Sequence, residues 1–105
     1  MNVSFGLRGL LVVTMIAIPA HVQGQELQNG ATLARQVCSE CHAVQRQEAR
    51  SPDVRAPTFQ QLAAEPGMTR TALTVALTTP HAGMPMFRLT PEQREDIIAY
   101  ILSLR

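Results

Sequence analysis

Lysine and tryptophan are absent from this chain of 105 residues, and its aromatic side chains are three phenylalanines and one tyrosine. All nine cations are therefore arginines, and they nearly balance eight acidic residues, which gives a formal net charge of +1. No basic run offers a binding surface to nucleic acid or to an anionic membrane. Because bulky side chains are so few, a domain of this size is expected to need a disulfide, a metal or a cofactor at its centre.

The N-terminal segment 1–24 has the organisation of a secretory signal peptide. Arg8 precedes an apolar run at 9–20, which is shorter than the roughly 20 residues of a membrane span. The residues just before position 25 predict cleavage after residue 24, with cleavage near Ala20 as an alternative and an uncleaved N-terminal anchor as the competing interpretation. Cleavage would remove one arginine and leave a formally neutral domain, 25–105.

The remainder predicts an all-α domain with short helices, at residues 30–37, 58–65, 70–77 and 91–104. Asn29 and Thr69 are expected as N-caps, and the run 90–93 (Thr-Pro-Glu-Gln) combines a cap, a proline at the first helical position and an amide at the third. Segments 43–57 and 81–89 contain proline and show no period, so they are expected to be irregular. No segment is predicted to form a β-strand.

Both cysteines lie in the run Cys38-Ser39-Glu40-Cys41-His42. A redox Cys-x-x-Cys usually follows a strand, and none is predicted before Cys38. Zinc needs four ligands, but beyond this run only the distant His81 remains, and a disulfide across two residues is strained and closes almost no loop. The pattern Cys-x-x-Cys-His instead favours covalent haem c, with thioether bonds to Cys38 and Cys41 and iron bound by His42. An export signal agrees with this interpretation, because bacteria attach such haem outside the cytoplasm.

Iron bound by one histidine leaves the opposite axial position for a second ligand. The candidates are Met68, Met84, Met86 and His81. Most methionines fill cores, but Met84 stands before Pro85 in an irregular loop that the proline stiffens. This setting favours Met84 and leaves Met86 and His81 as alternatives.

From about Leu27 to Leu104 the chain resembles the small bacterial class I cytochromes c, the monohaem cytochrome c family. The resemblance covers nearly the whole domain expected after cleavage, and it rests on runs at 38–42 (Cys-Ser-Glu-Cys-His), 56–59 (Ala-Pro-Thr-Phe), 84–85 (Met-Pro), 89–90 (Leu-Thr) and 99–104 (Ala-Tyr-Ile-Leu-Ser-Leu). It implies an all-α fold of three to four short helices wrapped around one covalently bound haem.

The resemblance also assigns roles to single residues. In the family, the methionine ligand precedes a proline shortly before the Leu-Thr or Leu-Ser that opens the last helix, and this register selects Met84 over Met86 and His81. A proline carbonyl accepts a hydrogen bond from the second ring nitrogen of the ligand histidine, which corresponds to Pro57 and His42 here. Bonds of this kind orient the ring and tune the metal.

The family packs a glycine of its first helix against an aromatic residue of its last, and Gly30 and Tyr100 occupy these places. Ala34 stands where many members have an aromatic residue, so the contact there is expected to be looser. Several apolar residues are expected to pack around the haem or in the core: Phe59, Leu62, Leu73, Leu77, Phe87, Ile97 and Ile101.

These features together imply a periplasmic electron carrier and not an enzyme. Two axial ligands leave no open iron position for a substrate, and a thioether ligand favours a positive midpoint potential. The expected partners are redox proteins, docked through apolar and arginine patches around Met86 and Arg88, or a larger oxidoreductase complex. Neither nucleic acid nor strong membrane association after cleavage is expected. The alternatives are a fixed cytochrome c subunit of a dehydrogenase or oxidase, and a haem enzyme or sensor with a displaceable Met84.

Overall fold

The computed structural model describes residues 12–17 and 20–105, and residues 1–11 and 18–19 of the expected signal peptide lie outside the described residues. The described chain forms α1 (Ala20–Leu33), a π-helical turn (Ala34–Cys38), α2 (Phe59–Ala64), α3 (Arg70–Thr78) and α4 (Pro91–Ser103). In these residues the only β-type pairing is an isolated bridge between His81 and Met84. The prediction of an all-α chain is therefore confirmed.

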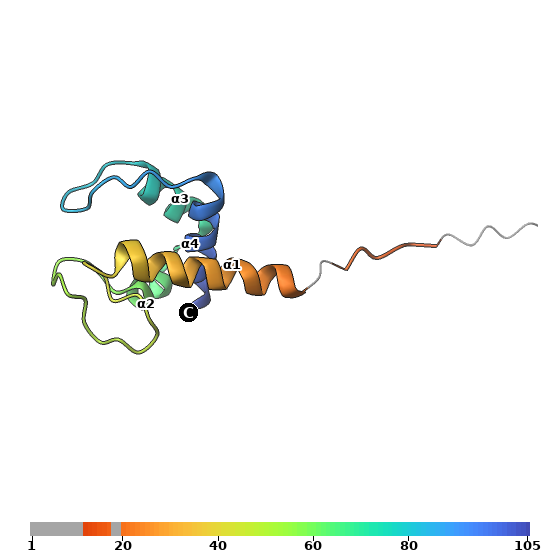
Figure 1. Ribbon diagram of the computed structural model, residues 1–105, viewed down its shortest axis with the longest axis horizontal. Helices are drawn as coiled ribbons and strands as arrows, with labels where there is room; N and C mark the ends of the chain where they lie inside the picture. Colours follow the sequence, from red (N-terminus) through yellow and green to blue (C-terminus); the bar gives the residue numbers. More distant parts are fainter. Residues whose placement is uncertain (1–11, 18–19) are drawn as a thin grey trace, which may run out of the picture.

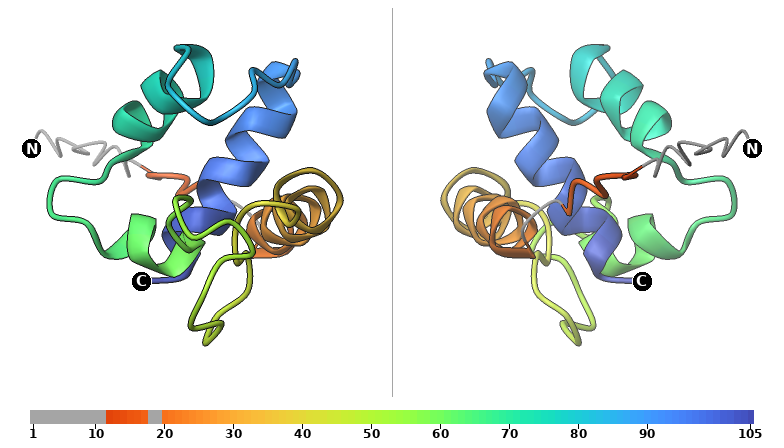
Figure 2. Two further views of the ribbon diagram at one scale, coloured as in Figure 1. Left: turned by 90° about the vertical axis from the view of Figure 1, so that its left-hand side faces the viewer. Right: turned by 90° about the vertical axis from the view of Figure 1, so that its right-hand side faces the viewer.

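Helix α4 is the central element of the fold. It contacts α1 on one side and α2 and α3 on the other, as the two end-on views in Figure 2 show. In Figure 1, α4 crosses α1, while the long connections before α2 and before α4 extend toward the same end of the molecule. The two irregular segments, 39–58 and 79–90, therefore lie at one end of the molecule, beyond the helices.

Helix α1 begins at Ala20, so the predicted N-cap at Asn29 is wrong. Asn29 lies inside the helix, where its Oδ1 accepts a hydrogen bond of 2.8 Å from Nε2 of Gln25. No proline interrupts the residues from Ala20 to Asn29, and Gly24 alone costs only about 1 kcal/mol relative to alanine. The helix therefore continues through Asn29 and across the expected cleavage point.

The other predicted caps are confirmed. The Thr69 hydroxyl accepts a hydrogen bond from the backbone N–H of Ala72 at the start of α3. Thr90 and Gln93 exchange the two bonds of a capping box at the start of α4, with Pro91 at the first helical position. A second capping box, between Thr58 and Gln61, opens α2.

Gly30 lies where α1 and α4 cross. A Cβ atom at this position would overlap the backbone oxygen of Asp96 and lie 2.7 Å from Cβ of Tyr100. The expected close packing of Gly30 against Tyr100 is therefore present. Helices α2, α3 and α4, the π-helical turn and the segments next to them form the core, and Leu33 of α1 packs against it. The core comprises Ala34, Val44, Phe59, Ala63, Leu73, Ile97, Ile98, Ile101 and Leu104.

Candidate cofactor site

The fold encloses a cavity of about 580 Å³, a size typical of small-molecule and cofactor sites. Its walls are mostly apolar side chains of α2, α3 and α4, including Phe59, Leu62, Leu73, Leu77, Ile97 and Ile101. The two irregular segments complete it and bring the candidate site residues to one place: Cys38, Cys41, His42, Pro57, His81 and Met84. The centre of this domain is therefore a cavity, as the shortage of aromatic side chains predicts.

The cysteines and the histidine are held by a short helical turn. The π-helical turn closes with a 3.0 Å bond from the N–H of Ser39 to the oxygen of Ala34. The N–H groups of Cys41 and His42 then donate to the oxygen of Cys38, at 3.2 and 2.9 Å. Burial raises the pKa of the Cys38 thiol to about 11, so this thiol is protonated at neutral pH. The turn presents two thiols and an imidazole to the same cavity.

The His42 ring is fixed from two sides. Its Nδ1 lies 2.7 Å from the carbonyl oxygen of Pro57, and its ring centroid lies 5.4 Å from that of Phe59. Since a carbonyl oxygen can only accept, Nδ1 carries the ring proton of the neutral imidazole. The lone pair is then on Nε2, which is the state of a histidine that binds a metal.

The loop before α4 directs its two methionines differently. Met84 is partly buried and lines the cavity, whereas Met86 is 50% exposed and does not line it. A tight turn with Gly83 at φ +81° pairs Met84 with His81, so that Nε2 of His81 lies 3.2 Å from the Met84 sulfur. Met68, from the α2–α3 connection, also lines the cavity.

Phe87 also lines the cavity but does not belong to the core, because 38% of it is exposed. Sequence reasoning missed the charged residues that line the cavity, Glu40, Asp53 and Arg55. The backbone N–H of Asp53 donates to the oxygen of Cys41 at 3.1 Å, and hydrogen bonds from Arg55 hold the pKa of the Asp53 carboxyl below its usual value. In the sequence, the only sign of this ion pair was the two-residue spacing of Asp53 and Arg55 within a predicted loop.

Among the described residues, no group of three or more His, Cys, Asp or Glu side chains could hold a metal ion. Neither cysteine is in a disulfide. A largely apolar cavity with a Cys-x-x-Cys-His turn in one wall and a methionine in a proline-stiffened loop fits a covalently attached haem. An all-α domain with this arrangement has the features of a c-type cytochrome.

Comparisons with known proteins agree. The cytochrome c family model matches residues 27–105. Cytochrome c-552 of Bradyrhizobium diazoefficiens is 37% identical over 101 residues, which cover 94% of this chain and 95% of that protein. No solved structure matches the chain. The chain belongs to the cytochrome c family, and the family implies a covalently bound haem c and a role in electron transfer. Among the described helices, none has the length and apolar character that crossing a membrane requires.

Proposed function

We propose that this protein carries one electron at a time between redox proteins of the bacterial periplasm. Cys38 and Cys41 hold the haem through thioether bonds, and His42 and Met84 are the two axial ligands of its iron. The Pro57 carbonyl fixes the His42 ring. When bound, haem c supplies an iron that alternates between the ferrous and ferric states.

The convergence of these residues on one cavity is the observation that carries the proposal. His42 and Met84 come from separate segments, which Figure 1 shows extending to the same end of the molecule. His42 has the tautomer of a metal ligand, and its ring is held by Pro57 and Phe59. Of the two methionines in the loop, only Met84 lines the cavity. Two protein ligands leave no open position for a substrate, which favours a carrier over an enzyme.

The test begins with the intact mass and the reduced absorption spectrum of the exported protein. We expect a mass equal to residues 25–105 plus one haem, and a six-coordinate low-spin spectrum. The ferric protein should show the long-wavelength absorption of an iron–thioether bond, and the reduced protein should bind carbon monoxide slowly or not at all. A colourless, folded protein with alkylatable cysteines would exclude the proposal.

A pair of variants identifies the sixth ligand. Met84→Leu should abolish the iron–thioether absorption, because it removes the sulfur that lines the cavity. Met86→Leu is the matched control in the same loop and should leave this absorption unchanged, because Met86 is half exposed and does not line the cavity. The opposite result would assign the ligand to Met86.

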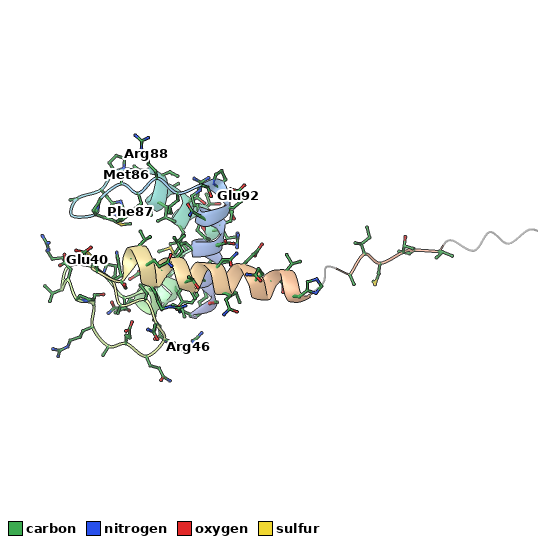
Figure 3. All side chains as sticks on the ribbon, viewed as in Figure 1. Glu40, Arg46, Met86, Phe87, Arg88 and Glu92 are labelled. Carbon is green, nitrogen blue, oxygen red and sulfur yellow. The ribbon has the colours of Figure 1, made fainter. Side chains whose placement is uncertain are left out.

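The exposed loop Met86–Arg88 is the proposed docking patch. Met86 and Phe87 are 50% and 38% exposed, and Figure 3 shows both beside Arg88 on the loop. Since the expected mature domain is formally neutral, long-range charge steering should be weak and the contact small. Electron-transfer rates with a partner should therefore change little with added salt, and a steep decrease would contradict this docking mode. Co-elution with a larger complex in native extracts would identify a fixed subunit instead.

A further inference from the structure

The cavity is lined by a second histidine whose setting resembles that of His42. His42 and His81 both line the cavity, and each places Nδ1 beside a backbone carbonyl oxygen. The distances are 2.7 Å from His42 to Pro57 and 3.2 Å from His81 to Thr79. Histidines that bind metals almost always direct the other ring nitrogen to such an acceptor. His81 therefore has the supporting contact of a metal ligand.

Each ring nitrogen of His81 faces a group that can only accept a hydrogen bond. Nδ1 faces the carbonyl oxygen of Thr79, while Nε2 lies 3.2 Å from the sulfur of Met84. A carbonyl oxygen and a thioether sulfur can both only accept, so the single N–H of the neutral imidazole serves one of these two contacts at a time, and the carbonyl is the stronger acceptor. When the proton is on Nδ1, Nε2 is free to bind a metal. Two iron-binding atoms thus lie 3.2 Å apart in the same turn of the loop.

We propose that His81 is a reserve axial ligand, which binds the haem iron through Nε2 whenever the Met84 thioether leaves it. This inference rests on the proposed function, because it takes Met84 as the resident ligand. The iron then remains six-coordinate with two imidazole ligands, and the domain does not become a binding site for small molecules. Replacing the thioether by an imidazole also lowers the midpoint potential, because methionine ligation raises it.

Three variants of the haem-loaded protein test this proposal, namely Met84→Ala, His81→Ala and the double variant. His81→Ala should keep the iron–thioether absorption. Met84→Ala should lose that absorption but stay low-spin, with the electron paramagnetic resonance signal of two imidazole ligands, and should bind carbon monoxide slowly. The double variant should be high-spin and bind carbon monoxide rapidly. Exogenous imidazole should return the double variant to the low-spin state, which shows that it still folds around the haem.

The small number of histidines in the chain identifies the source of a second imidazole ligand. It has three histidines, and His21 lies within the expected signal peptide, so a second imidazole on the iron of the mature protein must be His81. Spectra recorded over a range of protein concentrations exclude a histidine supplied by another molecule. Met84→Leu, which keeps the side-chain volume, is made in parallel and gives the same readout if Met84→Ala does not fold.

A Met84→Ala protein that is high-spin, or that acquires thioether ligation from Met86, would overturn the proposal. That failure differs from a failure of the proposed function, in which the wild-type protein itself would lack haem or the iron–thioether absorption. The wild-type spectrum therefore tests the proposed function, and the Met84→Ala spectrum tests the role of His81 as a reserve ligand.

Discussion

The substitution Gly30→Ala tests the helix crossing on which the fold depends. Alanine is the better helix former, and this preference alone would stabilise α1 by about 1 kcal/mol. The added Cβ, however, would overlap the backbone oxygen of Asp96 and lie 2.7 Å from Cβ of Tyr100. Neither atom is the end of a flexible side chain, so α1 and α4 must separate to make room.

Overpacking of this kind costs about 1–3 kcal/mol, and the rigid backbone atom at this site places the cost at the upper end. After subtraction of the gain in helix propensity, we expect a net loss of about 2 kcal/mol in the free energy of unfolding. For a domain of this size, such a loss lowers the melting temperature by about 8–16 °C.

The measurement is guanidinium unfolding of the ferric protein, followed by far-ultraviolet circular dichroism and compared with thermal unfolding. Gln28→Ala is the control, because Gln28 is an exposed residue of the same helix. It should change the stability by only a few tenths of a kcal/mol. The visible spectrum of Gly30→Ala should match the wild type, because Gly30 does not line the cavity. A Gly30→Ala protein as stable as the wild type, or more stable, would refute the close crossing.

Substitutions at three further positions test contacts that hold α4. Arg46→Ala removes bonds to the carbonyl oxygens of Ser103, Leu104 and Arg105 at the end of the chain, and should cost about 2 kcal/mol in chemical denaturation, with Arg46→Lys restoring only part. Thr90→Ala removes the N-cap and should cost about 1 kcal/mol in the same assay. Tyr100→Phe removes a 2.6 Å bond to the Val44 oxygen and should cost about 1 kcal/mol. Burial raises the pKa of Tyr100 above 10.0. The contribution of the protonated phenol to stability is therefore fully present below that pH and is lost as the pH rises through the raised pKa. The alkaline loss of stability should accordingly be smaller in Tyr100→Phe.

Some errors of sequence reasoning have clear physical causes. The Asn29 cap was wrong because an N-cap contributes only about 1 kcal/mol, and residues 20–28 contain no proline that would break the helix before it. Thr69 and Thr90 were right because each follows a proline- or glycine-containing loop that already interrupts the helix. A cap residue thus predicts a helix start reliably where the preceding backbone cannot be helical.

Features formed by residues close together along the chain could be predicted from the sequence. The Cys-x-x-Cys-His turn, the capping boxes and the Met84-Pro85 step each lie within a few residues, where short-range backbone geometry decides the outcome. The all-α class followed from the same short-range signals, and the family match agrees with it.

Which groups from distant parts of the chain meet depends on how the helices and loops pack. In the folded chain the Pro57 oxygen lies against His42, Met84 lines the cavity whereas Met86 does not, and His81 lies beside the Met84 sulfur. The reason is that irregular segments have no period to fix the direction of their side chains. Their conformation is set by packing against α4 and the cavity walls, which are remote in the sequence.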